Sequence, residues 1–389
     1  MPEASTRETP NTLMTTEHTL PGAPPMELRG SSVFDDPSLH YVRVEKAGDE
    51  PPAVPGIVDV AVLDMHHGFP NLGHFSIVDT LLGMGRDERA LIGPGAPEFR
   101  VVSFDVRSGL AVPASAERYT VVVGTGGPGD IDPRRNDGIA EFSQGVAEDP
   151  SWEAPLFRFF DGALRNESLA LLAICHSFGL LCRWSGMAEP VLRGPEKGGK
   201  SHGPVSNVLT EEARTHPWFS GYFEASHDAV VEVLDSRLFD LVPTGSSAAR
   251  VLAHESNGKP GGPGEALTMM EVARDRDGRH PRMWGVNHHP EIGDRGLQRL
   301  RLDRLSAHGG VSAAWIEERR EALAAWNHSA HTVRGLQTTT EHTFERPLRL
   351  HVRRALTAAA VSAASFGASA AVTTASFGAA AAASTPTRD

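Results

Sequence analysis

The sequence predicts an α/β domain with a doubly wound, mostly parallel sheet, flanked by disordered segments at both ends. Continuous apolar runs rich in Val and Ile alternate with stretches of helical character, which is the pattern of parallel strands covered on both faces. The chain has 389 residues, of which 40% are hydrophobic and 22% are charged, as in an ordinary globular protein. This length allows one large domain with flanking segments, or two domains.

The predicted strands and helices follow one another along the middle of the chain. Short apolar runs bounded by turn residues predict buried strands, whereas apolar residues three or four positions apart predict helices. The expected strands are 57–63, 99–104, 120–123, 169–174, 230–234, 250–254, 267–272 and 282–286. The expected helices are 74–85, a segment around 139–146, 153–164, 176–185, 295–306 and 311–325. We therefore expect one α/β domain over residues 56–306.

The N-terminal segment does not share this pattern. Residues 1–55 contain nine of the 28 prolines and show no sustained helical or strand periodicity. So little apolar surface cannot offset the entropy cost of ordering the backbone, so this segment is expected to be mostly disordered. A short docked strand around 41–44 stays open as an alternative.

The C-terminal part divides into two segments. Residues 307–354 are expected to form an amphipathic helical appendage with Trp315, Leu323 and Trp326 on its apolar side. Residues 355–389 are rich in Ala and Ser and repeat the pentapeptide ASFGA. Such side chains bury little apolar area, so a flexible or loosely helical tail is favoured over a membrane-spanning or helix-pairing segment.

Charge and cysteine content exclude several function classes. With 37 Lys and Arg against 49 Asp and Glu, the net charge is −12, so the chain lacks the basic footprint of a nucleic-acid-binding protein and would be repelled by an acidic membrane surface. The two cysteines, Cys175 and Cys182, cannot form a disulfide framework and favour a reducing compartment. The first twenty residues contain no apolar segment typical of a secretory signal, and a cytoplasmic protein is expected.

A candidate nucleophile follows the apolar run 169–174. Cys175 ends this strand, and the chain then continues directly into a predicted helix. A strand–turn–helix arrangement exposes a nucleophile at the carboxyl end of the strand, and the positive end of the helix favours the thiolate. The alternative is a small buried hydrophobic residue, which is what most free cysteines are.

A glycine-rich turn follows the predicted strand 120–123. It runs from Gly124 to Asp130 with the sequence Gly-Thr-Gly-Gly-Pro-Gly-Asp. Glycines let the backbone approach a ligand, and their N–H groups can point at a developing oxyanion. No Gly-Lys-Ser/Thr follows, which excludes a phosphate-binding P-loop, and an ordinary turn is the alternative.

The last predicted strand leads into the sequence Asn-His-His-Pro-Glu, Asn287 to Glu291. An imidazole can take a thiol proton and later deliver it to a leaving group, provided that a third group orients the ring. Glu291 is well placed to orient His289 in this way. A metal site is disfavoured, because neighbouring histidines on a strand point to opposite faces and no Cys or Asp completes a tetrahedral set. Neither a metal nor a cofactor is expected.

The three segments lie at the carboxyl ends of predicted parallel strands, where open α/β sheets place their active sites. Together they resemble class I glutamine amidotransferase domains, which carry a glycine–proline oxyanion loop (here Gly126–Asp130), a cysteine elbow (Cys175) and a closing Gly-Val-Gln-x-His-Pro-Glu (Gly285–Glu291). Ser236–Gly245 falls where that family often has Ser-His-x-Asp-x-Val-x-x-Leu-Pro-x-Gly. The resemblance covers about residues 57–306 and implies a flavodoxin-like three-layer fold.

The resemblance also implies a reaction. Cys175 would attack the side-chain amide of glutamine to give a glutamyl thioester and ammonia. His289 would act first as the base and then as the acid, and Glu291 would orient His289. Water would then hydrolyse the thioester to glutamate.

Oxyanion and substrate binding are assigned by the same resemblance to Gly126, Gly127 and His176. The backbone N–H groups of Gly127 and His176 would form the oxyanion hole. No ammonia-consuming module is recognisable on this chain, so a synthase subunit that accepts ammonia is the expected partner.

The chain departs from the family pattern where glutamine itself would be recognised. The two elbow glycines are replaced by Ala173 and Ser177, the elbow glutamine by Gly179, the later histidine by Arg237 and the closing-motif glutamine by Asn287. The cysteine, histidine and glutamate of the family's catalytic triad are retained, so a cysteine hydrolase is better supported than a glutaminase specific for glutamine.

Three alternatives stay open. The substrate could be another γ-glutamyl amide or peptide, or the scaffold could serve a noncatalytic binding or regulatory role. Ala173–His176 also resembles the elbow of the PfpI-like branch, in which the histidine after the cysteine is catalytic. That branch lacks the closing His-Pro-Glu of this chain, so the amidotransferase branch is favoured. Outside the motifs, Cys182 is expected in the core and Lys197–Lys200 in a solvated loop.

Overall fold

The computed structural model describes residues 36–225, 229–246, 248–259, 261–308, 311–325 and 328–382. For residues 223–225, 308 and 366–382 it describes the backbone alone. Most of the predicted N-terminal segment, residue Trp326 and the last seven positions lie outside the described residues.

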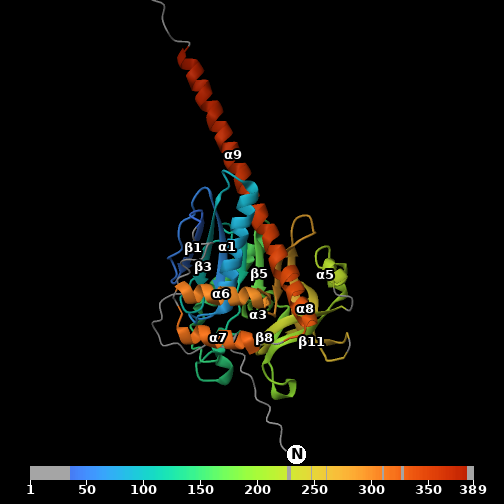
Figure 1. Cartoon of the computed structure of the whole chain (residues 1–389). Coiled ribbons are helices and arrows are strands. Elements are labelled where there is room, and N and C mark those ends of the chain that lie inside the picture. Colours follow the sequence, from blue (N-terminus) through green and yellow to red (C-terminus); the bar gives the residue numbers. More distant parts are fainter. Residues whose placement is uncertain are drawn as a thin grey trace, which may run out of the picture.

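A ten-stranded sheet forms the centre of the described chain (Figure 1). Its strands are β1 Leu39–Val44, β2 Ile57–Asp64, β3 Glu98–Asp105, β4 Val121–Gly124, β5 Ala170–Ile174, β7 Ser201–Leu209, β8 Val230–Arg237, β10 Arg250–Ser256, β11 Pro263–Arg274 and β12 Pro281–Val286. They lie in the order β1-β3-β2-β4-β5-β12-β11-β10-β7-β8. The strands from β1 to β12 in this order are parallel, and the others are added antiparallel. A small antiparallel pair, β6 Ala188–Leu192 and β9 Phe239–Pro243, lies outside this sheet.

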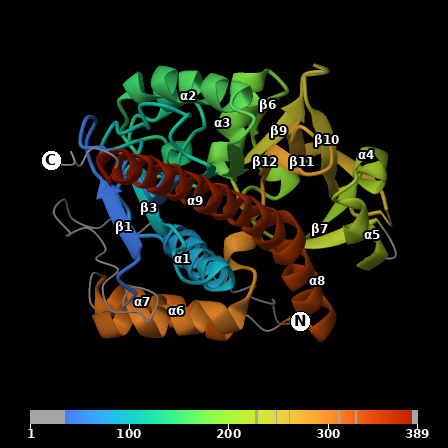
Figure 2. The same cartoon turned by 90° about the horizontal axis from the view of Figure 1, so that it is seen from above.

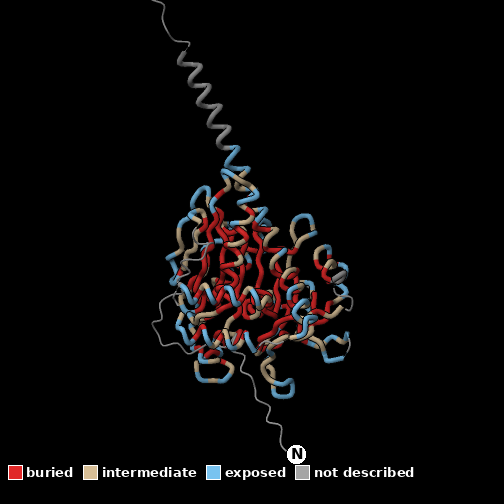
Figure 3. The backbone as a smooth tube through the Cα atoms, in the orientation of Figure 1, coloured by how far each residue is buried: buried red, intermediate tan, exposed pale blue. Residues whose placement is uncertain are grey.

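Helices cover both faces of the sheet (Figure 2). They are α1 Leu72–Ile92, α2 Glu153–Arg165, α3 His176–Ser185, α4 Glu211–Thr215, α5 Ser220–Ala225, α6 Arg295–His308, α7 Ala313–Ala325, α8 Ala330–Thr340 and α9 Arg346–Ala382. The core is split accordingly: Val60 and Val62 of β2 pack with α1 and α6, whereas Ala61 and Leu63 pack with α2 and α3. Buried residues are concentrated in the strands between the two helical layers (Figure 3). The predicted three-layer α/β fold is therefore confirmed.

One predicted helix is wrong. The stretch around 139–146 forms a 3₁₀ turn, η2 Glu141–Ser143, in place of an α-helix. Gln144 and Gly145 follow this turn with φ angles of 50° and 79°, a left-handed conformation that ends any helix. At the N-terminal edge, the alternative of a short strand around 41–44 is confirmed, because β1 forms there and pairs with β3.

The segment after residue 306 packs on the sheet through its apolar side chains. Trp315 and Leu323 of α7 are buried, and Leu336 of α8 and Leu348 of α9 belong to the same core as β2. A π-helical turn, η6 Glu341–Glu345, connects α8 to α9. The hydrophobic effect thus draws this segment over one face of the sheet.

The long helix α9 includes most of the Ala- and Ser-rich segment. It continues to Ala382 and extends beyond the body of the molecule (Figure 1). Within the described residues, no helix combines the length and the apolar character needed to cross a membrane.

The packing of α9 can be tested by truncating a buried residue. Leu348→Ala should lower the free energy of unfolding by about 2–5 kcal/mol, because Leu348 is fully buried and the substitution leaves a cavity. The matched control Val361→Ala lies further along the same helix, where the side chain is 61% exposed, and should change stability by less than about 0.5 kcal/mol. Urea unfolding measures both, and equal effects would contradict this placement of α9.

Candidate active site

The register between β5 and β12 brings two of the predicted segments together. Ile174 lies opposite Val286 in parallel pairing. The N–H of Cys175 then donates to the carbonyl of Val286 at 2.8 Å, so the pairing continues one residue past β5. Because parallel strands end at the same edge of a sheet, the turn after β5 and the loop after β12 meet there.

Cys175 has a strained backbone. Its φ of 50° and ψ of −101° lie outside the regions that residues other than glycine favour, which costs about 1–3 kcal/mol. The turn is held by Ser177, whose Oγ donates to the Ile174 carbonyl at 3.0 Å and accepts from the Ile174 N–H at 2.8 Å. The Ser177 N–H donates to the Thr125 carbonyl. The half-buried Cys175 side chain is thereby presented at the start of α3.

Cys182 behaves as the sequence predicts for a core residue. It is fully buried on α3 beside Met270, and burial raises the pKa of its thiol. The two cysteines of the chain therefore lie in different environments, and the thiol at the strand end is the accessible one.

His289 lies between a carboxylate and the sulfur. Its Nδ1 is 2.8 Å from Glu291 Oε1, and the Cys175 sulfur is close enough for its charge to act on the ring. The hydrogen-bond contact of this sulfur is with the Ser236 carbonyl at 3.8 Å. Since Nδ1 faces the carboxylate, Nε2 is the ring nitrogen left over, and it has no hydrogen-bond partner among the described residues. Burial lowers the pKa of His289, but the Glu291 carboxylate and the Cys175 sulfur outweigh burial and raise this pKa well above its usual value. The protonated ring is therefore stabilised.

The glycine-rich loop closes over these side chains. A Cβ on Gly126 would lie 2.7 Å from His289 Cε1 and 3.5 Å from the Cys175 Cβ. A Cβ on Gly127 would lie 2.2 Å from the carbonyl oxygen of Met65. No side chain fits at either position, so glycine is required for the loop backbone to reach Cys175 and His289.

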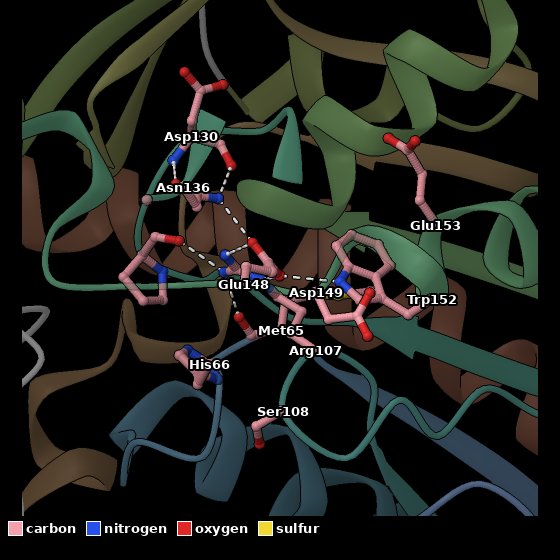
Figure 4. Close-up of polar contacts among 12 residues, drawn as sticks. Met65, His66, Arg107, Ser108, Asp130, Asn136, Glu148, Asp149, Trp152 and Glu153 are labelled. Carbon is pink, nitrogen blue, oxygen red and sulfur yellow. Dashed lines mark hydrogen bonds and ion pairs between the residues drawn. The ribbon is translucent and has the colours of Figure 1, made fainter. Parts of the chain in front are cut away.

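A buried ion pair holds the backbone of this loop in place (Figure 4). The Arg107 Nη1 donates to the carbonyls of Pro128 at 2.7 Å and Met65 at 2.9 Å. Its Nη2 donates to Glu148 Oε2 at 2.7 Å, and the side chains of both partners are fully buried. A buried pair of this kind is tolerated only when its remaining hydrogen-bonding groups are satisfied.

Asn136 and Trp152 complete this network (Figure 4). The Nδ2 of Asn136 donates to Glu148 Oε2 and to the Asp130 carbonyl, and its Oδ1 accepts from the Asp130 N–H. The Trp152 Nε1 donates to Glu148 Oε1 at 3.0 Å. The loop between Gly126 and Asp130 is thus fixed through the carbonyls of Pro128 and Asp130 and the N–H groups of Gly129 and Asp130. The Gly127 N–H has no acceptor among the described residues.

The loop after β12 is held by the C-terminal helices. Thr340 Oγ1 donates to the Pro290 carbonyl at 2.8 Å. Gln298 Nε2 and Arg301 Nη1 donate to the Glu291 carbonyl at 3.0 and 3.3 Å. The N-terminal end of α1 fills the remaining side, where a Cβ on Gly73 would lie 2.8 Å from Glu291 Oε1. The Glu291 main chain is therefore held in place, and its carboxylate contacts His289 through Oε1, whereas Oε2 has no hydrogen-bond partner among the described residues.

His288 has no comparable environment. It is buried near Thr343, and burial together with the neighbouring His289 lowers its pKa to about 3. Within the described residues, no group of three or more His, Cys, Asp or Glu side chains could hold a metal ion.

A pocket of about 250 Å³ opens beside the sulfur. Four of the six predicted site residues line it, whereas Gly126 and Glu291 lie against the His289 ring without lining the pocket. The four are Gly127, Cys175, His176 and His289.

Two of the departures from the family pattern, Arg237 and Asn287, line this pocket, and Gly179 packs against the lining residue Ile131. A Cβ on Gly179 would lie 2.4 Å from Ile131 Cδ1, so Ile131 takes the space in which a longer elbow side chain would stand. Arg237 lines the pocket and forms ion pairs with Asp235, Asp240 and Glu255. These substitutions are accompanied by local packing and charge pairing that accommodate them.

Several residues of the site were not found from the sequence. Lys200 was expected in a solvated loop, but it lines the pocket, whereas Lys197 pairs with Asp240 at 3.1 Å. Arg107 and Glu148 belong to no motif, and their pairing depends on contacts between distant parts of the chain. A lone buried charge in a strand-rich region is the single signal that could have drawn attention to Arg107.

No protein-family model and no curated protein matches this chain. Solved structures resemble it at low identity. One assigned as a GMP synthase component of Thermoplasma acidophilum is 10% identical, with 67% of this chain and 96% of that chain covered and a TM-score of 0.35. The CTPS glutaminase domain of Trypanosoma brucei is 8% identical, with 70% and 96% covered and a TM-score of 0.37.

A third similar structure, assigned as a ThuA-like protein of Bacteroides uniformis, is 11% identical, with 69% of this chain and 94% of that chain covered and a TM-score of 0.32. Amidotransferase-type proteins are thus among the structures that this chain resembles. At these identities and TM-scores the similarity says nothing about the site, whose chemistry has to follow from its own residues.

The ion pair beneath the loop can be tested by removing one partner. Arg107→Met should lower the free energy of unfolding by about 3–5 kcal/mol, because it leaves the Glu148 carboxylate buried and unpaired. The double variant Arg107→Met/Glu148→Leu should cost less than the two single changes together. The control Arg86→Met breaks an exposed pair with Asp87 and should cost less than about 1 kcal/mol. Additive effects in urea unfolding would rule out a coupled pair.

The charge environment of His289 gives a second prediction. Glu291→Gln removes the carboxylate that stabilises the protonated ring, so the pKa of His289 should fall and the ring should lose its proton at lower pH than in the wild type. NMR titration of the imidazole resonances measures this shift. The control Glu98→Gln removes a carboxylate from the distant His40 ring and should leave the His289 pKa unchanged. An unchanged His289 titration in Glu291→Gln would contradict the contact.

Proposed function

We propose that this chain is a cysteine-dependent amide hydrolase of the glutamine amidotransferase type. The observation that carries the proposal is the position of the His289 ring, with Glu291 Oε1 at 2.8 Å from Nδ1 and the Cys175 sulfur close enough for its charge to raise the pKa of the ring. A nucleophile, a base within reach of it and a third group that orients the base are the minimum for acyl transfer through a thiol.

The first half-reaction forms a thioester and releases ammonia. The Cys175 thiolate attacks the carbonyl carbon of a primary amide while the proton of the thiol resides on His289. The tetrahedral intermediate collapses as His289 protonates the departing nitrogen, so the C–N bond breaks and NH₃ leaves. The Glu291 carboxylate keeps Nδ1 protonated and holds the ring in the orientation that serves both transfers.

The oxyanion is stabilised by backbone amides. The N–H groups of Gly127 and His176 border the pocket, and neither donates to an acceptor in the described parts of the chain. We assign both as donors to the oxygen that becomes negative in the tetrahedral intermediate. The Arg107–Glu148 pair would contribute indirectly, by fixing the carbonyl of Pro128 next to Gly127.

The second half-reaction regenerates the thiol. Neutral His289 takes a proton from water, the hydroxide attacks the thioester carbonyl, and the C–S bond breaks to leave a carboxylic acid and the thiolate. The sum is amide plus water to acid plus ammonia. Glutamine or a related γ-glutamyl amide is the substrate that the sequence resemblance supports. We further propose a cytoplasmic protein whose ammonia passes to a synthase partner.

His289 is a better candidate for the base than His176. The pKa of His176 is lowered well below its usual value by burial and by Arg107 and His66, so its ring stays neutral. The pKa of His289, in contrast, responds directly to the Cys175 sulfur. This difference favours the amidotransferase type over the PfpI-like alternative.

The proposal is tested by removing the sulfur. Cys175→Ala should reduce ammonia release from glutamine or γ-glutamyl amides by at least ~10³-fold, because the covalent route is lost. Cys182→Ala is the matched control and should retain activity, since Cys182 lies in the core away from the pocket. Mass spectrometry should detect an acyl group on Cys175 in the wild type. If the wild type releases no ammonia from any of these amides, the proposed function is wrong and a noncatalytic role gains support.

A further inference from the structure

The described side chains that line the pocket include cations but no carboxylates. Among the described residues that line it, none is Asp or Glu, whereas Lys200, Arg237 and the histidines His66, His176 and His289 can carry positive charge. His66 lies 2.7 Å from the Asp64 carboxylate, and burial lowers the pKa of His176. Arg237 is neutralised by its three carboxylate partners, and His289 is matched by Glu291 and the sulfur. Among the described residues, Lys200 is thus the pocket cation whose charge has no direct partner.

The environment of Lys200 differs from that of its neighbour Lys197. The Lys197 ammonium bonds to Asp240 at 3.1 Å. The Lys200 ammonium forms no hydrogen bond or ion pair among the described residues, although it is half-buried and close enough to the Cys175 sulfur and the Asp235 carboxylate to interact with their charges. Asp235 itself is bonded to Ser201 and paired with Arg237. A half-buried ammonium without a partner favours an anion brought by a ligand.

A second polar group points to a ligand in the same pocket. Asn287 also lines it and is 96% buried, since 4% of its surface is exposed. Its Nδ2 has no hydrogen-bond partner in the described part of the chain. A buried N–H donor without an acceptor is costly, and a bound carboxylate oxygen would satisfy it.

We propose that the pocket selects amides that carry a carboxylate but no free ammonium group, with Lys200 as the residue that binds the carboxylate. This rests on the proposed function and narrows its substrate class to anionic monoamides, in which the amino group of the γ-glutamyl unit is absent or acylated. The ammonium of free glutamine would meet Lys200 and no acidic side chain among the described residues that line the pocket, because the nearby Asp235 lies outside this lining and is paired with Arg237. This disfavours free glutamine.

Three substrates of the same chain length test the effects of the carboxylate and of the ammonium group separately. Glutaric acid monoamide differs from glutamine by the missing ammonium, and from pentanamide by the carboxylate. We expect kcat/KM for the monoamide to exceed that for glutamine and for pentanamide by roughly tenfold or more. Lys200→Met should abolish the advantage over pentanamide mainly by raising KM, and Lys200→Arg should retain it. Lys197→Met is the matched control and should behave as the wild type.

A measurement without turnover separates this inference from the hydrolase proposal. Iodoacetate and iodoacetamide alkylate the same sulfur and differ in charge, so their rate ratio at Cys175 reports the local preference for anions. Lys200→Met should lower that ratio about three- to tenfold relative to the wild type, with Lys197→Met unchanged. If no amide is hydrolysed but the ratio falls, anion selection stands and the hydrolase proposal fails. If the ratio and the substrate preference are the same in Lys200→Met, or glutamine is the best substrate, the inference is overturned.

Discussion

The candidate site depends on the parallel pairing of β5 with β12. This pairing sets Ile174 opposite Val286 and lets the Cys175 N–H bond to the Val286 carbonyl. A shift of one residue would turn Cys175 toward the opposite face of the sheet and away from His289, because side chains alternate along a strand. The hydrogen-bond ladder of the sheet therefore brings Cys175 and His289 to the same edge of the sheet, before any contact between their side chains is made.

Around this pairing, the structure uses buried charge to hold backbone in place. Arg107 fixes the carbonyl of Pro128, and Gln298 and Arg301 fix that of Glu291. Each carbonyl belongs to a loop that carries no regular hydrogen-bond ladder of its own. Charged donors make stronger hydrogen bonds than neutral ones, and their desolvation is offset when carboxylates such as Glu148 and Asp79 complete the pairs. The two loops are thus held by interior ion pairs together with the neutral donor Gln298, all contributed by distant segments.

This division explains what the sequence could and could not predict. The strands and the segments at Cys175 and His289 were predictable, because burial and turn formation depend on the residue types and their spacing within a short stretch of sequence. The Arg107–Glu148 pair and the position of Lys200 were not, since they depend on which strands become neighbours. The false helix around 139–146 has the same origin: its apolar spacing was helical, but Gln144 and Gly145 adopt positive φ within a loop packed under the active-site glycines.

The substitutions that separate this chain from the family pattern bear on whether the site is eroded or adapted. In an eroded site, a lost recognition residue leaves a void or an unpaired charge. Here Ser177 bonds to both backbone groups of Ile174, Ile131 fills the space beside Gly179, and Arg237 is paired with three carboxylates. The strained φ of Cys175 is retained as well, at a cost in stability that a purely structural role would not require. Asn287 differs from these, because its buried Nδ2 has no partner among the described residues, and a ligand in the pocket would supply one. This combination favours a pocket rebuilt for a different amide over a scaffold that has lost its chemistry.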